Sequence, residues 1–251
     1  MIWEKPLKIS PPPPRRSSLD RGPGVTPRFK APAWLVLKDR PAMRVDLHIH
    51  TRPKSPCSAI DFSALLEAAR KSGLDGICLT EHQNRWTDAE AKEWGQPGGV
   101  RIFQGNEITT SQGDILVFGL DREVKGVVPI QDLRQEVEAV RGLMIAAHPF
   151  RGFLLFGIGQ LHLDVEQACK RTVFQFVDGL EVHNCKVTDP ENDMARQVAE
   201  RLGLLGVAGS DAHRLEEVGQ CVTVFNREVR TEQDLIEELR AGRFTVETRR
   251  S

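Results

Sequence analysis

From residue 44 onward, short apolar segments with the period of a β-strand alternate with amphipathic segments that have the period of a helix. We expect strands at residues 44–49, 76–80, 100–104, 114–119, 143–147, 178–183, 205–209 and 221–225. We expect helices at residues 61–73, 131–142, 189–203 and 231–242. Asp189 and Thr231 are the expected capping residues of the last two helices. This alternation predicts an α/β fold with a mainly parallel sheet.

The N-terminal part of the chain differs from the rest. Residues 1–40 hold eight of the 15 prolines and nine Lys/Arg against three Asp/Glu, a net charge of +6. Such a segment cannot build a core, so we predict a disordered Pro/Arg-rich extension over 1–40 and a single folded domain over 41–251. A basic arm that touches nucleic acid is an alternative interpretation of the extension.

Composition restricts the class of protein. A hydrophobic content of 40% and a charged content of 27% are typical of a soluble globular protein. No apolar run approaches the roughly 18 residues that a membrane helix needs, and the N-terminus lacks the apolar region of a secretory signal. Five cysteines without a C-x-x-C pair predict thiols in a reducing compartment, most simply the cytoplasm. The body after residue 40 carries a net charge of −7, which argues against a large nucleic-acid surface.

Six of the seven histidines follow directly on the predicted strands, together with several carboxylates. The strand ends read "HIH" at 48–50, "TEH" at 80–82, "GNE" at 105–107, "HPFR" at 148–151, "EVHN" at 181–184 and "SDAH" at 210–213. In a (β/α) barrel all such ends open on one face, which carries the active site. Imidazoles and carboxylates gathered there suit Zn²⁺, Mn²⁺ or Fe. They are too many for one ion, so we expect two or three.

The motifs "DLHIHT", "LTEH", "GNE", "AAHPFR" and "GSDAH", in this order, resemble those of the polymerase-and-histidinol-phosphatase (PHP) family. The resemblance runs from about residue 44 to 245. It implies a distorted seven-stranded (β/α) TIM-like barrel with a di- or trinuclear metal site. It also implies hydrolysis of phosphate mono- or diesters.

Matched position by position, the resemblance implies a set of ligands. The ligands of the first two ions are expected to be His48, His50, Glu107, His148 and Asp211, with Glu107 bridging. A third ion is expected to use His82 and His213, which we also take as catalytic residues. Asp46, on the same strand face as His48 and His50, is expected to accept a hydrogen bond from a histidine ring and so fix its tautomer. Glu81 is likewise expected to support the ligands without binding an ion itself.

The chain departs from the family pattern at several positions. Glu81 stands where the family usually has Asp. The loop after His50 lacks a histidine that some members supply, and Cys57 or Asp61 is a candidate substitute. Between Glu107 and His148 another histidine is missing, and Asp114 is the best replacement.

Two further residues near the motifs have open roles. His183 shares a predicted strand face with Glu181, and ligand, substrate contact and packed polar residue are all open interpretations. Arg151 is expected to clamp a phosphate oxygen with its forked guanidinium. The apolar segment 152–160 is interpreted as a lid or wall over the site.

The expected function is hydrolysis of a small phosphomonoester or phosphodiester by a metal-bound hydroxide. One alternative is a nuclease that acts on DNA or RNA ends with the same metal chemistry; it is possible but not favoured. The other is a non-catalytic regulatory module that binds metal, against which the open ligand set argues. The expected partner is a small-molecule phosphate ester; no membrane is expected, and oligomeric state is not indicated.

Overall fold

The computed structural model describes residues 42–87, 90, 99–152 and 164–249, all of them within the compact unit Asp39–Ser251. The predicted N-terminal extension, residues 1–40, lies outside the described residues, and so do residues 153–160 of the predicted lid. The predicted domain boundary therefore stays a prediction. Among the described helices, none combines the length and hydrophobicity that a membrane span requires.

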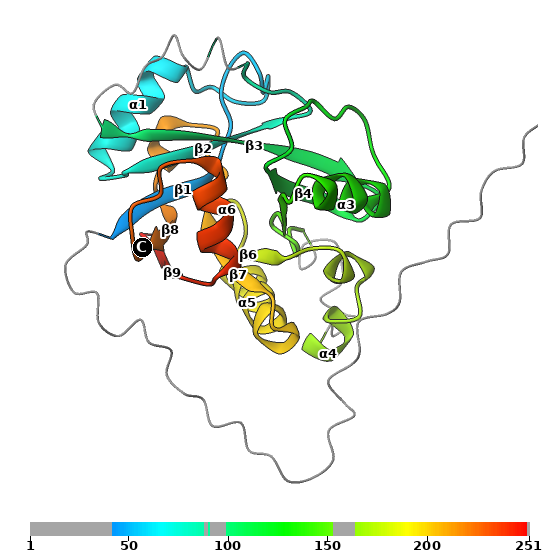
Figure 1. Ribbon diagram of the computed structural model, residues 1–251. Coiled ribbons are helices and arrows are strands. Elements are labelled where there is room, and N and C mark those ends of the chain that lie inside the picture. The colour runs from blue at the N-terminus through cyan, green and yellow to red at the C-terminus, as the bar shows by residue number, and fades with distance from the viewer. Residues whose placement is uncertain (1–41, 88–89, 91–98, 153–163, 250–251) are drawn as a thin grey trace, which may run out of the picture. The chain divides into compact units, whose positions relative to one another are not determined.

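The described strands form one nine-stranded sheet in the order β7-β6-β5-β4-β3-β2-β1-β8-β9; Figure 1 labels all of them except β5. They are β1 (Met43–Ile49), β2 (Gly76–His82), β3 (Arg101–Thr110), β4 (Gly113–Phe118), β5 (Leu143–Ala146), β6 (Gly179–Asn184), β7 (Leu205–Gly209), β8 (Cys221–Phe225) and β9 (Phe244–Thr248). All eight predicted strands are confirmed, with ends shifted by a few residues. The barrel type is confirmed, but the expected count of seven strands is wrong. β9 was not predicted, because its residues are exposed or half-buried and give little apolar signal.

The sheet is mixed rather than mainly parallel. β1, β2 and β3 run parallel, as do β5, β6 and β7, whereas β4 runs antiparallel to both of its neighbours. β8 runs antiparallel to β1 and β9. The prediction of a mainly parallel sheet was wrong because the short segment between β3 and β4 makes a hairpin, which alternation alone does not indicate.

The two ends of the sheet approach each other and nearly close it into a barrel. The N–H of Ala208 in β7 donates to Thr223 Oγ1 in β8 at 3.0 Å. Beyond β7, Ala212 forms a bridge to Ile49 in β1, and the His50 N–H donates to the Ala212 carbonyl at 3.1 Å. This closure places the residues after β7 beside those after β1.

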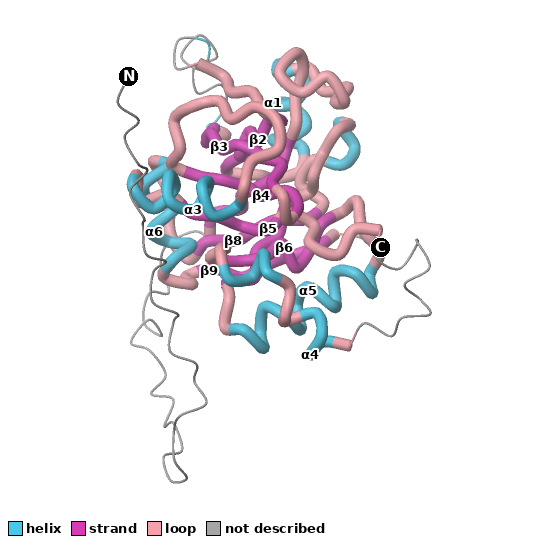
Figure 2. Tube along the Cα trace, turned by 90° about the vertical axis from the view of Figure 1, so that its right-hand side faces the viewer, coloured by secondary structure: helices cyan, strands magenta, loops and turns pink. Residues whose placement is uncertain are grey.

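Helices lie around the strands, which occupy the centre in Figure 2. They are α1 (Phe62–Lys71), α3 (Ile130–Ala139), α4 (Val165–Ala168), α5 (Asp189–Leu202) and α6 (Glu232–Arg240), with the 3-10 turns η3 (Thr172–Gln175) and η4 (Leu215–Glu217). The four predicted helices are confirmed. Apolar faces hold them on the sheet: Leu65 and Ala69 of α1 pack with Ile77 and Leu79 of β2.

The cap of α5 lies one residue before the predicted one. Thr188 is the N-cap, and its N–H and hydroxyl both donate to Glu191 Oε2, at 2.8 Å and 3.0 Å, as part of a capping box. Asp189 is instead the first helical residue, where its charge favours the helix N-terminus. Thr231 caps α6 as predicted.

Candidate metal centre

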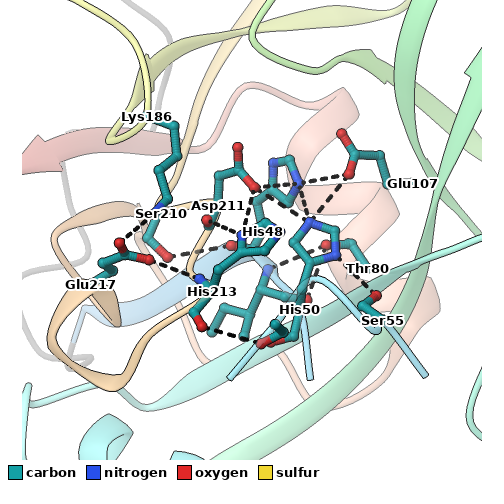
Figure 3. Close-up of polar contacts among 12 residues, drawn as sticks. His48, His50, Ser55, Thr80, Glu107, Lys186, Ser210, Asp211, His213 and Glu217 are labelled. Carbon is teal, nitrogen blue, oxygen red and sulfur yellow. Dashed lines mark hydrogen bonds and ion pairs between the residues drawn. The ribbon is translucent and has the colours of Figure 1, made fainter. Parts of the chain in front are cut away.

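The strand ends bring the predicted ligand residues together at one place (Figure 3). His50, which follows β1, lies at the centre: its Nε2 is 3.2 Å from Glu107 Oε2 and 3.4 Å from Asp211 Oδ1. The Nε2 of His48 reaches the same two oxygens, at 3.4 Å and 3.5 Å. Side chains from β1, β3 and the loop after β7 therefore meet, although they are far apart in the sequence.

Three more histidines surround this centre. His148 Nε2 lies 2.9 Å from Glu107 Oε1 and 4.0 Å from Asp211 Oδ2. His82 Nδ1 lies 3.0 Å from Glu107 Oε2. His213 Nδ1 lies 3.5 Å from Asp211 Oδ1 and 2.9 Å from the carbonyl of the same residue. The structure thus gathers every residue that the sequence analysis placed in the main ligand set.

Within the cluster, sets of three ligand atoms lie close enough to share an ion. Their atoms lie within 4.8 Å of one another in the groups His50–His82–His213, His48–His50–Glu107, His48–His148–Asp211 and Glu107–Asp114–His148. Glu107 belongs to two groups and directs one oxygen towards His148 and the other towards His50. This is the arrangement of a carboxylate that can bridge two cations.

Glu181 orients two of the histidines. It lies on β6, is 1% exposed, and its Oε1 is 2.8 Å from His48 Nδ1. Its Oε2 accepts hydrogen bonds from the backbone N–H of His148 at 2.8 Å and from Asn184 Nδ2 at 2.9 Å. A carboxylate at Nδ1 keeps the proton of His48 there, so that the lone pair of Nε2 faces the cluster.

The buried polar atoms of the cluster fit a cation. His50 Nδ1 lies 3.3 Å from Ser55 Oγ, and its Nε2 faces inward, 2.9 Å from His48 Nε2. Glu107 Oε2 is buried and makes no well-directed hydrogen bond within the described part of the chain, although imidazole nitrogens of His82 and His50 lie 3.0 Å and 3.2 Å away. Two facing imidazole nitrogens and a carboxylate oxygen this close together need positive charge among them, which a bound cation or a proton on an imidazole supplies. Imidazole nitrogen and carboxylate oxygen are the donors that Zn²⁺, Mn²⁺ and Fe accept.

The backbone is strained at two of the candidate ligands. His148 has φ 29° and Asp211 has φ 57°, values in the left-handed region that residues other than glycine rarely adopt. Such residues cost about 1–3 kcal/mol each and persist where the surrounding structure imposes them. Hydrogen bonds impose the conformation here: the N–H of His148 donates to Glu181, and Ala212, next to Asp211, bridges β1.

A glycine leaves room for this arrangement. A Cβ on Gly209, the last residue of β7, would lie 2.6 Å from the Cβ of His48 and 2.8 Å from Glu181 Oε1. The absence of a side chain at Gly209 therefore allows the histidine and its orienting carboxylate to sit against the strand.

Charges in the cluster shift the pKa values of its members. Burial raises the pKa of Glu107, but the charge of His48 and hydrogen bonds from neighbouring histidines outweigh it, and the pKa lies well below its usual value. Burial also raises the pKa of Asp211, but His48, His50 and Arg151 outweigh it, and the pKa of Asp211 lies below its usual value. Burial lowers the pKa of His48, but surrounding carboxylates raise it well above its ordinary value. Both acids are therefore anions, which a cation site requires.

Asp46 does not have the role that the sequence predicted. Instead of a histidine ring, its carboxylate accepts the backbone N–H groups of Ser210 and Gly219, both at 2.9 Å, and of His48 at 3.3 Å. The register of β1 against β2 shifts between Asp46 and Ile49, so strict alternation does not hold along this strand. Asp46 therefore ties the loops after β7 and η4 to β1.

His183 belongs to none of the ligand groups found in the described residues, which speaks against its interpretation as a ligand, and the expected strand face shared with Glu181 is not observed. Between these two residues the register of β6 against β7 shifts by one, as in a β-bulge. Because the extra residue interrupts the alternation, Glu181 and Asn184 are buried against each other while His183 lies elsewhere. His183 instead lines a separate cavity with residues of α5, among them Asn192 and Arg196.

Glu81 supports the loop that follows β1. Its carboxylate accepts hydrogen bonds from the N–H and hydroxyl of Thr51 and from Trp86 Nε1, the last at 3.0 Å. Glu81 is 1% exposed, so these contacts replace its hydration. Its position beside the loop that begins at His50 is consistent with a supporting role.

Asp114 and Arg151 lie beside the cluster. Asp114 joins one of the possible ligand groups, which makes it a plausible replacement for the missing histidine. The guanidinium of Arg151 forms an ion pair with Asp211 Oδ2. Cys57 and Asp61, the candidate substitutes in the loop after β1, belong to none of the ligand groups found within the described ranges.

Two supporting residues were missed by the sequence analysis. Glu181 was expected only to share a strand face with His183, although a carboxylate on a buried strand requires a buried partner. Ser55 contacts His50 Nδ1 and also accepts the N–H of His82 at 3.1 Å. No sequence signal distinguishes Ser55, because a loop serine is compatible with many environments.

The fold and the cluster define a barrel of the PHP type whose strand ends gather potential metal ligands. Residues 189–244 match the PHP-associated family model, PHP_C. The resemblance to the PHP family that the motifs predicted is therefore confirmed.

The curated relatives come from Methanocaldococcus jannaschii. One, the uncharacterized protein MJ1587, is 28% identical over 152 residues, which cover 57% of this chain and 82% of the relative. The other, MJ0417, also described as uncharacterized, is 27% identical over 193 residues, or 73% of this chain and 71% of the relative. Neither name states an activity.

Solved structures share the fold. PsfC from Pseudomonas syringae is 22% identical, with a TM-score of 0.57 and coverage of 82% of this chain and 91% of its own. A Bacteroides vulgatus protein containing a predicted PHP-like metal-dependent phosphoesterase is 22% identical (TM-score 0.58, coverage 84% and 66%). The lesion-specific endonuclease PfuEndoQ from Pyrococcus furiosus is 15% identical (TM-score 0.56, coverage 82% and 57%). At these identities the common feature is the fold.

Proposed function

We propose that this protein hydrolyses a small phosphate ester with the help of two or three divalent ions held at the cluster. The observation that carries this proposal is the sharing of Glu107, His48, His50 and His148 among overlapping ligand groups. A purely structural metal site has a single closed shell of ligands, whereas overlapping groups suit adjacent ions with open positions. The PHP-like phosphoesterase among the solved neighbours is consistent with this chemistry.

A cavity beside the cluster offers room and charge for an anionic substrate. It has a volume of about 240 Å³ and is lined by, among others, Asp114, His148, Arg151 and Arg171. The Arg171 guanidinium lies over the rings of Phe150 and Phe174, at 5.3 Å and 5.6 Å from their centroids. Two guanidinium groups at one cavity favour phosphate, which their forked donors match.

The residues of the chain have distinct tasks in this proposal. The candidate ions would be held by His48, His50, Glu107, His148 and Asp211, with His82, His213 and Asp114 completing the set. When bound, such ions neutralise phosphate charge and lower the pKa of water. Glu181 keeps His48 in the tautomer that directs its lone pair inward. Arg151 is placed to exchange its contact with Asp211 for one with substrate phosphate.

The test is metal analysis of the purified protein followed by a screen of phosphomonoesters and phosphodiesters with added Mn²⁺ or Zn²⁺. We expect bound metal and turnover of an ester, both lost in His50→Ala. Glu247→Gln, a substitution at a half-exposed residue of β9, is the matched control and should keep both. Bound metal without turnover of any ester would overturn the proposal and leave the regulatory module as the better explanation.

Nucleic acid is the second candidate substrate, because residues 1–40 carry a net charge of +6. The endonuclease among the structural neighbours is compatible with it. A gel shift with DNA or RNA that weakens with salt and disappears on deletion of residues 1–40 would favour this candidate. Absence of binding at low salt would eliminate it. A reducing, cytoplasmic location remains a prediction from the cysteine content.

A further inference from the structure

Two cysteines, Cys185 and Cys221, lie in contact although they stand at the ends of different strands of the sheet. The Sγ of Cys185, directly after β6, is 2.7 Å from the Sγ of Cys221, the first residue of β8, although 36 positions separate them. Ordinary nonbonded contacts between heavy atoms are longer, about 3.5–4.0 Å for carbon, and a disulfide bond is about 2.05 Å. The described residues contain no second pair of cysteine sulfurs in such contact.

The backbone on both sides of this pair is held in place. Cys221 is 1% exposed and pairs with Thr248 in the ladder between β8 and β9. Cys185 follows the buried Asn184, whose N–H donates to Asn192 Oδ1 at 3.0 Å and whose Oδ1 accepts the N–H of Lys186 at 2.8 Å. The fold itself therefore brings the two sulfurs together, and a bond between them requires little movement of the main chain.

We propose that Cys185 and Cys221 form a reversible intramolecular disulfide. With glutathione disulfide as oxidant, the partly exposed Cys185 thiolate attacks one of its sulfurs, forms a mixed disulfide and releases one glutathione thiolate. The Cys221 thiolate then attacks the Cys185 sulfur, forms the protein disulfide and releases the second glutathione thiolate. Both protein thiols lose their protons, and two electrons pass to glutathione.

The bond would act close to the candidate metal centre. Lys186, next to Cys185, forms an ion pair with Glu217, and Glu217 Oε2 accepts the N–H of His213 at 2.8 Å. The disulfide would join the segment after β6, which carries Lys186, to the start of β8, four residues after Glu217. The oxidised form is therefore expected to hold the loop that carries His213 more firmly and to raise the melting temperature, because the cross-link restricts the unfolded chain.

The test uses the full chain, reduced, desalted and equilibrated in glutathione buffers of increasing oxidised fraction. Thiols are then alkylated, and peptides are mapped by mass spectrometry without reduction. We expect a Cys185–Cys221 cross-linked peptide and a melting temperature several degrees higher, both reversed by dithiothreitol. Cys185→Ser should abolish the cross-link and the shift, whereas Cys57→Ser, at an exposed loop cysteine, should retain both.

Three results would overturn the proposal. The first is alkylation of both thiols in the most oxidising buffer, and the second is a glutathione adduct on Cys185 without the cross-link. The third is a cross-link that lowers the melting temperature, since this would show that the bond does not fit the native fold. Disulfide mapping depends on neither metal nor turnover, and the melting temperatures are compared at the same metal content, so the disulfide and the proposed function can fail separately.

Discussion

Replacing Glu181 by Gln tests whether the supporting carboxylate, rather than the ligands alone, determines metal binding. In the native protein one oxygen faces His48 Nδ1 at 2.8 Å, and the other accepts hydrogen bonds from the backbone N–H of His148 at 2.8 Å and from the side-chain Nδ2 of Asn184 at 2.9 Å. All three partners can donate, and a carboxylate can accept from all of them. A glutamine side chain has one accepting oxygen and one donating nitrogen, so it cannot.

The less costly orientation of the amide keeps its oxygen towards the two N–H groups and turns its nitrogen towards His48. The amide then donates to Nδ1, and the proton of His48 moves to Nε2, which faces the cluster and can no longer bind a cation. Loss of such a supporting contact costs about 10–100-fold in metal affinity or activity, or about 1.4–2.7 kcal/mol.

The assay is titration of metal-free protein with Zn²⁺ or Mn²⁺, followed by calorimetry or by competition with a chromophoric chelator. We expect Glu181→Gln to bind at least tenfold more weakly while its circular dichroism spectrum stays that of the wild type. Glu247→Gln is again the control. Wild-type affinity in a folded Glu181→Gln protein would refute the assignment of the His48 tautomer to this carboxylate.

Four further predictions address the same centre and the surrounding fold. Gly209→Ala, whose Cβ would lie 2.6 Å from the Cβ of His48, is expected to cost about 1–3 kcal/mol in chemical denaturation and to weaken metal binding. Removal of metal with a chelator should lower the melting temperature, since a ligand at a free concentration of 100 times its Kd stabilises the folded state by about 2.7 kcal/mol. An unchanged melting temperature would argue against a bound ion. Arg151→Gln should raise KM for an anionic ester more than it lowers kcat, and an unchanged KM would remove this residue from the substrate site. The hydrogen bond from Arg243 lowers the pKa of Glu238, so the ionised carboxylate stabilises the folded state above the usual pKa of Glu, and this stabilisation is lost as pH falls through the lowered pKa. In Glu238→Gln the free energy of unfolding, measured by chemical denaturation, should therefore fall less steeply with decreasing pH.

The sequence predicted the elements of the fold well because their apolar periods are long and regular. All eight predicted strands and four predicted helices exist, and the helix ends lie within three residues of the predicted ones. Pairing was less predictable, because the antiparallel hairpin of β3 and β4 depends on a short turn that ends at Gly113 (φ 112°), which the alternation of strands and helices does not indicate. β9 was missed because its side chains contribute little to the core.

The main ligand set was also predictable, since its residues stand at strand ends and a barrel gathers those ends. Contacts between side chains and neighbouring loops were not, because they depend on how those loops fold back. Ser55 illustrates this limit: its contacts with His50 and with the N–H of His82 follow from the conformation of the loop after β1.

The two wrong assignments within the site have the same physical origin. Asp46 was expected to contact a histidine ring and His183 to share a strand face with Glu181, both on the assumption that side chains alternate strictly along a strand. Register shifts occur between Asp46 and Ile49 in β1 and between Glu181 and His183 in β6. Each shift changes which side chains share a face, and the second one turns Asn184 rather than His183 towards Glu181. Bulges near the ends of these strands thus allow a regular sheet to aim a few polar side chains at one point, and strand alternation fails at the positions where they do so.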